Sequence, residues 1–267
     1  MSWWQALILG IIQGLTEFLP VSSSGHLTIG QELLHVQFDN GDMLLFDVIV
    51  HAATVCATIV ILYKDVWQLL KGTFMTTQWN SEKIYVSKLL LSMIPIFVVG
   101  MFFKDQVTAI FGSGLEIVGT CLLMTAALLC FAHFAKPRPR TDISWWHAFI
   151  IGIAQAVAVL PGLSRSGATI ATGIIMGDNK EKVSHFSFLM VLIPVLGATF
   201  LDLVDILQGE VSSGLSWWTM IVGFVAAFVT GCLACQWMLE IVKKQKLLYF
   251  AVYCAIVGVF AIIYGLY

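Results

Sequence analysis

Long apolar stretches dominate the chain, and six of them are long enough to cross a lipid bilayer. A transmembrane helix needs about 20 predominantly apolar residues. The pattern predicts spans near residues 44–63, 88–103, 115–135, 186–206, 216–239 and 247–267. The second span is short, and residues of the Asp105–Phe111 region could extend it. We therefore expect an all-α integral membrane protein.

Two further apolar segments are too short to span and are interrupted by polar residues. Segments 3–19 and 145–160 each end at a proline that serine and glycine residues follow. Within a bilayer, a broken helix is tolerated only where protein buries it or where it lines a polar cavity. We interpret residues 3–30 and 145–177 as re-entrant helical hairpins, which enter the membrane and return to the same side.

The two hairpins belong to a sequence repeat. Residues 2–13 (SWWQALILGIIQ) and 144–155 (SWWHAFIIGIAQ) are identical at eight of twelve positions, at a constant offset of 142. This likeness predicts two related halves, residues 1–136 and 144–267, within a single membrane domain of residues 1–267. Each half contains a hairpin and three spans. Because three is odd, the second half must insert upside down, which gives an inverted-topology repeat.

Composition excludes a soluble globular protein. The chain is 59% hydrophobic and only 11% charged, with a net charge of −2 and a mean hydropathy of +0.90. Soluble domains contain about 45–50% apolar and about 25% charged residues. We expect a membrane protein with no soluble domain and no nucleic-acid partner.

The basic residues predict the orientation. Cytoplasmic loops of membrane proteins are enriched in lysine and arginine, so we place the loop of residues 136–140 in the cytoplasm. Lys104 then lies outside and Arg165 lies within a hairpin. The other twelve of the fourteen fall on the cytoplasmic side: Lys64, Lys71, Lys83, Lys88, Lys136, Arg138, Arg140, Lys180, Lys182, Lys243, Lys244 and Lys246. Both termini and the mouth of the first hairpin would face outward.

The first hairpin contains an acidic residue at membrane depth. Gln13 and Glu17 are four positions apart and so share one helix face. A carboxylate inside a membrane costs at least about 2.5 kcal/mol unless it is paired, protonated or hydrated. Glu17 is therefore a candidate functional residue. The structural alternative is that it simply neutralises a buried cation.

A hydroxyl-rich cluster follows that acid at residues 21–26 (VSSSGH). Ser22, Ser23, Ser24 and Gly25 offer hydroxyls and backbone N–H groups to an anion such as phosphate. His26 can act as a nucleophile or as a general acid or base near neutral pH. The alternative for His26 is a polar group with a purely structural partner.

The second hairpin carries a cation instead of an acid. Val159 stands where the first hairpin has Glu17, and Arg165 lies between two serines in Ser164-Arg165-Ser166-Gly167. A guanidinium flanked by hydroxyls suits a phosphate or pyrophosphate, because it donates in a bidentate fork and neutralises charge. We expect Arg165 to pair with Glu17 at one time and with an anionic ligand at another.

Asp47 and His51 form a weaker candidate pair. They are four positions apart near the outer half of the first full span and could line the same cavity. A polar contact between helices is the structural alternative.

At these motifs the chain resembles the undecaprenyl-pyrophosphate phosphatase family of bacterial membranes, which is also known for bacitracin resistance. The resemblance covers essentially the whole chain and is carried by QGLTEFLPVSSSGH at 13–26 and PGLSRSGATI at 161–170. It implies hydrolysis of undecaprenyl pyrophosphate to undecaprenyl phosphate and inorganic phosphate, which recycles the lipid carrier of cell-wall synthesis. It also implies a magnesium or calcium ion, a bacterial inner (plasma) membrane and an active site that opens toward the periplasm.

Family roles carry over to Glu17, Ser23, His26, Ser164, Arg165 and Ser166. We predict four catalytic residues: Glu17, Ser23, His26 and Arg165. We predict that the substrate is bound by Gln13, Ser22, Ser24, Gly25, Ser164, Ser166, Gly167 and Thr169. Many family members have glutamate where this chain has Gln13, so a divalent cation would rely on Glu17, on substrate phosphates and on Asp47 or water.

Two questions stay open at this point. The nucleophile could be Ser23, with His26 as its natural proton acceptor, or His26 itself, or water. A polyprenyl-phosphate flippase or anion transporter on the same inverted-repeat scaffold is the rival function. That rival would need Arg165 and the serines but not Glu17 and His26. The oligomeric state is also open, and a homodimer is one option.

Overall fold

The computed structural model describes the whole chain except residues 37–41, 112–113, 136–141, 208–213, 244–245 and 267. Lys136, Arg138, Arg140 and Lys244 lie outside the described residues, as do the side chains of Lys104 and Lys243. The described part of the chain is all-helical: α1 (Trp3–Phe18), α2 (Ser23–Leu33), α3 (Asp42–Ile61), α4 (Tyr63–Phe74), α5 (Ser81–Phe102), α6 (Lys104–Phe111), α7 (Leu115–Phe134), α8 (Trp145–Val157), α9 (Arg165–Met176), α10 (Lys180–Leu207), α11 (Trp217–Lys243) and α12 (Leu247–Gly265).

Six of these helices are long and apolar enough to cross a membrane, namely α3, α5, α7, α10, α11 and α12. They correspond to the six predicted spans, so the chain is a multi-pass membrane protein. Two boundaries were predicted wrongly. α5 begins at Ser81 rather than near residue 88, and α10 begins at Lys180 rather than near residue 186. Residues Lys104–Phe111 form a helix of their own and do not extend the second span.

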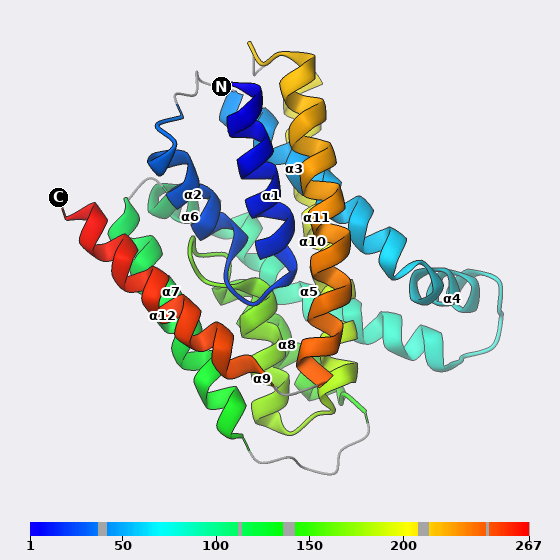
Figure 1. Cartoon of the computed structure of the whole chain (residues 1–267). Helices are drawn as coiled ribbons and strands as arrows, with labels where there is room; N and C mark the ends of the chain where they lie inside the picture. Colours follow the sequence, from blue (N-terminus) through cyan, green and yellow to red (C-terminus); the bar gives the residue numbers. More distant parts are fainter. Residues whose placement is uncertain (37–41, 112–113, 136–141, 208–213, 244–245, 267) are drawn as a thin grey trace.

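The short helices form two hairpins whose turns lie near the middle of the molecule. Figure 1 shows α1 running inward from the end that carries the N-terminus, with α2 returning beside it. α8 runs inward from the opposite end and α9 returns. The turn between α1 and α2 and the turn between α8 and α9 are called the first and second tips below.

Each hairpin packs on a span of the other half of the chain. A Cβ added to Gly10 of α1 would lie 2.6 Å from the carbonyl oxygen of Gly223 on α11. A Cβ added to Gly152 of α8 would collide with the carbonyl oxygen of Ser92 on α5. Gly10 and Gly152 are separated by the 142-residue offset of the repeat. Small residues allow such close approach of helices in membranes.

A second glycine contact joins the last span of each half. A Cβ added to Gly119 of α7 would lie 2.5 Å from the carbonyl oxygen of Gly258 on α12. A Cβ added to Gly258 would lie 2.8 Å from the carbonyl oxygen of Gly119. The backbones of α7 and α12 are therefore in direct contact. Each of these two helices also contacts one tip, as described below.

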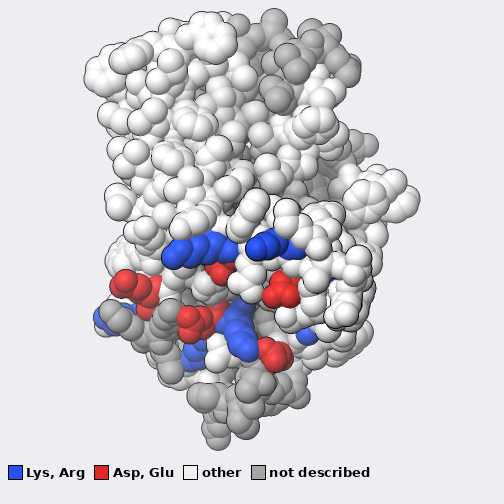
Figure 2. Space-filling model, turned by 90° about the vertical axis from the view of Figure 1, so that its right-hand side faces the viewer, with Lys and Arg blue, Asp and Glu red and all other residues white. Residues whose placement is uncertain are grey.

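Charged side chains on one face of the molecule gather toward one end. Figure 2 shows lysines and acidic residues in the lower part of this face, while its upper part is free of both types among the described residues. α4 lies at this level of the fold, beside the start of α5. We call the end of the molecule toward which these charged side chains gather the basic end.

Candidate active site

Both tips end at a serine that caps the second helix of the hairpin. The Ser22 hydroxyl accepts a hydrogen bond from the N–H of Gly25 at 3.3 Å. The Ser164 hydroxyl accepts from the N–H of Gly167 at 3.0 Å. The two capping serines again differ by 142 positions. Each tip therefore presents a helix N-terminus, where N–H groups and the positive end of the helix dipole favour an anion.

The first tip has an unusual backbone at Ser22. Its φ angle is 72°, a region that costs a residue with a side chain about 1–3 kcal/mol. In this conformation the Ser22 carbonyl accepts from both the N–H and Nδ1 of His26, at 3.2 and 2.8 Å. These two hydrogen bonds hold the His26 ring at the tip.

The tips touch each other through glycine. A Cβ added to Gly25 would lie 2.9 Å from the Cα of Gly162 on the second tip. Gly162 itself has a φ of 90°, and an added Cβ there would collide with the carbonyl of Val118 on α7. Gly25 was predicted to bind the ligand. The structure shows a further reason for a glycine at this position, because the two tips approach closely here.

A hydrogen-bond network centred on Glu17 joins the hairpins. Its Oε1 accepts from Nη2 of Arg165 at 3.1 Å. Its Oε2 accepts from the Ser23 hydroxyl at 2.5 Å and from Nε2 of Gln13 at 3.0 Å. Four residues that we predicted from the sequence therefore meet at one carboxylate, and the Glu17–Arg165 pair expected from the sequence is present.

This ion pair is largely removed from water. The Glu17 side chain is 9% exposed and the Arg165 side chain 25% exposed. Breaking a buried pair by removing one partner typically costs about 3–5 kcal/mol, because the remaining charge is uncompensated. Glu17 thus holds the Arg165 side chain at the tips.

Ser23 and His26 do not pair with each other. The Ser23 hydroxyl donates to Glu17, whereas Nε2 of His26 lies 2.9 Å from the hydroxyl of Tyr253 on α12. The His26 and Tyr253 rings also stack, with centroids 5.5 Å apart and planes 9° apart. Because Nδ1 must donate to the Ser22 carbonyl, Nε2 of the neutral imidazole accepts from Tyr253.

Tyr253 and Thr125 were not identified from the sequence. Thr125 of α7 accepts from the N–H of Ser164 at 3.0 Å and so supports the second tip. Cys254, next to Tyr253, donates to the carbonyl of Pro20 in the first tip at 3.7 Å. A tyrosine or threonine within an apolar span gives no sequence signal of such a contact.

The remaining predicted residues lie at the tips in supporting positions. The Ser166 hydroxyl donates to the carbonyl of Leu19 on the first tip at 3.3 Å. Thr169 hydrogen-bonds Ser187 of α10 at 2.5 Å and the carbonyl of Arg165 at 2.8 Å. The Ser24 hydroxyl lies 3.4 Å from that of Ser22.

The cavity between the tips is small. It measures about 10 Å³ and is lined by both hairpins, including Glu17, Ser23, Ser164 and Arg165. A space of about 10–15 Å³ holds one water molecule. The space between the tips therefore has room for about one water molecule.

The residues around Glu17 can offer two oxygen ligands to a hard cation. Oε1 of Gln13 is buried and has no hydrogen-bond partner, while the Gln13 amide nitrogen is bound to Glu17. Among the described residues, no three His, Cys, Asp or Glu side chains gather as a metal site. This set fits a magnesium or calcium ion whose other ligands come from water or substrate oxygens.

Asp47 and His51 interact through the backbone. Nδ1 of His51 lies 2.7 Å from the main-chain carbonyl of Asp47, so the ring donates to that carbonyl within α3. α3 reaches the space beside Glu17 through Thr54, Val55 and Thr58. That Asp47 and His51 line the same cavity stays a prediction.

Comparison with known proteins identifies the family. Residues 6–260 match the family described as bacitracin resistance protein BacA, a range that includes both tips and reaches all six spans. The chain belongs to the BacA family. The network around Glu17 is thus formed by two segments of a BacA-family sequence that lie 148 positions apart.

Curated relatives of this BacA-family chain carry one name. Proteins of Bacteroides fragilis and Bacteroides thetaiotaomicron, both named undecaprenyl-diphosphatase, are each 59% identical over 264 residues. The match covers 98% of this chain in both, and 98% and 99% of the two relatives respectively. A protein of Alkaliphilus metalliredigens with the same name is 36% identical over 282 residues and is matched across the full length of both chains.

Proposed function

We propose that this chain is an undecaprenyl-diphosphatase, a membrane phosphatase that hydrolyses undecaprenyl pyrophosphate to undecaprenyl phosphate and inorganic phosphate. Membership of the BacA family and the shared name of relatives at 59% identity support this activity. Bacitracin resistance follows from the family. The structural observation that carries the proposal is the Glu17–Arg165 pair between two helix N-termini, which suits a charged phosphoryl group.

The proposed architecture is an inverted repeat of residues 1–136 and 144–267, each with a re-entrant hairpin and three spans. Three features support it. The capping serines Ser22 and Ser164 obey the 142-residue offset, as do the contact glycines Gly10 and Gly152. Each of these glycines packs on the other half of the chain. α7 and α12 meet through reciprocal glycine contacts and support one tip each.

In the proposed binding mode, the pyrophosphate enters between the tips and replaces Glu17 as the partner of Arg165. Serine hydroxyls and backbone N–H groups at the N-termini of α2 and α9 bind the remaining phosphate oxygens. The predicted ligand residues are Gln13, Ser22, Ser24, Gly25, Ser164, Ser166, Gly167 and Thr169. Thr169 also hydrogen-bonds Ser187 and so joins α9 to α10.

Ser23 is the proposed nucleophile. Its hydroxyl already donates to Glu17 at 2.5 Å, so the carboxylate can take the proton as the oxygen attacks the terminal phosphorus. The bond from that phosphorus to the bridging oxygen breaks, and undecaprenyl phosphate leaves. Water then hydrolyses the phosphoserine and releases inorganic phosphate, and in this proposal His26 assists that step.

A divalent cation, magnesium or calcium, is part of the proposal. Glu17 and Oε1 of Gln13 would hold it together with phosphate oxygens of the substrate. When bound, such an ion neutralises charge on the phosphates and so lowers the barrier to attack by an oxygen nucleophile.

The proposed location is the bacterial inner membrane, with the active site open toward the periplasm. The six spans and the family support a multi-pass membrane protein of this kind. The basic residues support the orientation, since Lys88 and Lys182, which the sequence assigns to the cytoplasmic side, line one cavity. A homodimer stays a prediction.

Phosphate release from undecaprenyl pyrophosphate by the purified, detergent-solubilised protein tests the function. We expect release with magnesium or calcium, loss of release with a chelator, and loss in Glu17→Gln. Lys64→Gln, at the start of α4 and away from the tips, is the control and should keep wild-type activity. Absence of release from folded wild-type protein would contradict the enzyme function and would favour lipid-phosphate transport, measured in liposomes.

A further inference from the structure

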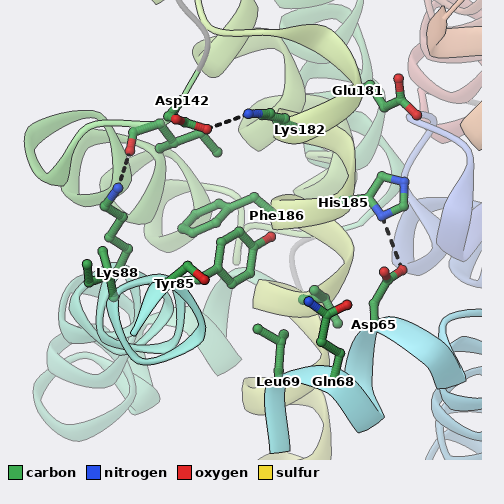
Figure 3. Close-up of a pocket in the computed structure, with 14 residues that line it drawn as sticks. Asp65, Gln68, Leu69, Tyr85, Lys88, Asp142, Glu181, Lys182, His185 and Phe186 are labelled. Carbon is green, nitrogen blue, oxygen red and sulfur yellow. Dashed lines mark hydrogen bonds and ion pairs between the residues drawn. The ribbon is translucent and has the colours of Figure 1, made fainter. Parts of the chain in front are cut away.

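A large cavity of the described structure lies away from the tips, at the basic end. It measures about 620 Å³, within the range of about 300–1,000 Å³ usual for small-molecule sites. α4, α5, α10 and the segment before α8 surround it (Figure 3). Its apolar floor consists of Leu69, Ile84, Tyr85, Phe186 and Leu189.

One edge of this cavity is positive. Nζ of Lys88 donates to the carbonyl of Ile143 at 2.7 Å, and Nζ of Lys182 lies 2.5 Å from Oδ1 of Asp142. Both ammonium groups therefore gather on one two-residue segment, which Figure 3 shows at the left and top of the cavity. The Lys182 ammonium holds the pKa of Asp142 below its usual range. Two cations against one carboxylate leave this edge with a net positive charge.

The opposite edge of the cavity is negatively charged, and it carries a hydroxyl group with no hydrogen-bond partner among the described residues. Asp65 of α4 lies 3.4 Å from Nδ1 of His185, and Glu181 lines the same side. The Tyr85 ring packs edge-on against Phe186 with centroids 5.7 Å apart. Its hydroxyl has no hydrogen-bond partner among the described residues and points toward the Asp65 side in Figure 3.

Exposed aromatic residues near the cavity are of the kind that membrane proteins place at the level of lipid headgroups. Trp67, Phe74 and Trp79 on and after α4 are 61%, 79% and 69% exposed. Nζ of Lys88 lies 5.7 Å from the centroid of the Trp145 ring. Exposed tryptophan and lysine side chains in membrane proteins concentrate at the interface between hydrocarbon and water.

We propose that this cavity binds a zwitterionic phospholipid with a primary-amine headgroup, phosphatidylethanolamine. Its phosphate lies against Lys88 and Lys182, its ammonium group donates to Asp65 and the Tyr85 hydroxyl, and the start of one acyl chain covers the apolar floor. The separated charges of the two edges match a headgroup that carries both charges. A trimethylated amine could not donate to Tyr85, and a purely anionic headgroup would face Asp65 and Glu181.

Native mass spectrometry of the purified full-length protein tests the proposal. The protein in mild detergent is titrated with phosphatidylethanolamine, phosphatidylcholine and phosphatidylglycerol that carry the same acyl chains. We expect one phosphatidylethanolamine to be retained about tenfold more tightly than either other lipid. Equal retention of all three, or preference for phosphatidylglycerol, would overturn the proposal.

Two variants change opposite edges of the site, and one is a control. Lys88→Gln and Asp65→Asn should each weaken retention of phosphatidylethanolamine at least fivefold. Lys71→Gln, on α4 but outside the cavity lining, should not. Phosphate release reports whether each variant is folded, because the tips lie elsewhere. Unchanged retention in a folded Lys88→Gln or Asp65→Asn variant would contradict the site.

Discussion

At the residue scale, Arg165 is the cation on which ligand binding at the tips depends in our proposal. It donates to Glu17 and lines the cavity that both hairpins share. Arg165→Lys keeps the charge but loses the planar fork that contacts two phosphate oxygens. We expect kcat/KM for undecaprenyl pyrophosphate to fall about 10²- to 10³-fold, the usual effect of losing one transition-state donor.

Phosphate-release kinetics over a range of substrate concentrations measure this loss. Lys64→Arg, the opposite exchange at a remote site, is the matched control and should behave as wild type. Wild-type kcat/KM in Arg165→Lys would show that point charge alone is sufficient and that the fork has no role.

Tyr253 acts as a positioning residue for His26. Tyr253→Phe keeps the stacked ring but removes the hydroxyl that His26 accepts from. We expect kcat to fall by up to about tenfold with KM unchanged, because one hydrogen bond contributes about 0.5–1.5 kcal/mol. Tyr253→Ala removes the stacking as well and should lower kcat further. The kcat and KM values of both variants provide the test, and equal kcat in Tyr253→Phe and wild type would argue against this role.

Sequence reasoning identified the charged residues but not all of their partners. Glu17 and Arg165 stand out in the sequence because an isolated charge within an apolar segment needs a partner. The same argument predicted that these two residues pair with each other. Ser23 pairs with Glu17 rather than with His26, whose ring contacts Tyr253, and Ser22 between the hairpin helices has a φ angle of 72°. No local pattern encodes that conformation.

At the element scale, glycine contacts set the distance between each hairpin and its supporting span. Gly10→Ala would place a methyl group 2.6 Å from a carbonyl of α11 and so push α1 outward. We expect the thermal midpoint of the detergent-solubilised protein to fall by several degrees, because such overpacking costs about 1–3 kcal/mol.

Gly100→Ala on α5 is the control, since an added Cβ there meets no atom within 4 Å. It should leave the midpoint unchanged or raise it slightly, because alanine favours a helix. A thermal-shift assay measures the midpoints of Gly10→Ala and Gly100→Ala for this comparison. A Gly10→Ala midpoint equal to that of Gly100→Ala would mean that α1 is not tightly packed.

The span boundaries show why apolar length alone misplaces a helix end. Lys83 and Lys88 ended the predicted second span near residue 88, yet α5 begins at Ser81. Their ammonium groups reach the main-chain carbonyls of Thr76 and Ile143, at 2.6 and 2.7 Å. Long lysine side chains can carry their charge away from a helix in this way, so the helix continues beyond the apolar residues.

At the scale of the whole molecule, the repeat predicted two halves, but it did not predict that each hairpin packs on a span of the other half. Hydropathy predicts an odd number of spans per half, and the proposed opposite insertion rests on that number. That α1 packs on α11 and α8 on α5 could not be predicted, because contacts between halves depend on backbone approach at Gly10 and Gly152.

The orientation is testable with single cysteines in a variant that lacks the six native ones. Ser2→Cys near the N-terminus and Asp142→Cys near the basic end should lie on opposite sides of the membrane. We expect a membrane-impermeant maleimide to label Ser2→Cys in intact spheroplasts, and Asp142→Cys only after permeabilisation. The reverse pattern would invert the topology, and labelling of both before permeabilisation would exclude it.

The central claim is that one hairpin supplies the acid and the other the cation of a single active site. A double-mutant cycle of Glu17→Gln, Arg165→Gln and the combined variant, measured as kcat/KM for phosphate release, tests it most directly. Residues that act as a unit lose activity non-additively. We predict that each single variant loses at least about 10²-fold and that the double variant loses little more than the worse single. Losses that multiply, or wild-type activity in either single variant, would contradict the shared site.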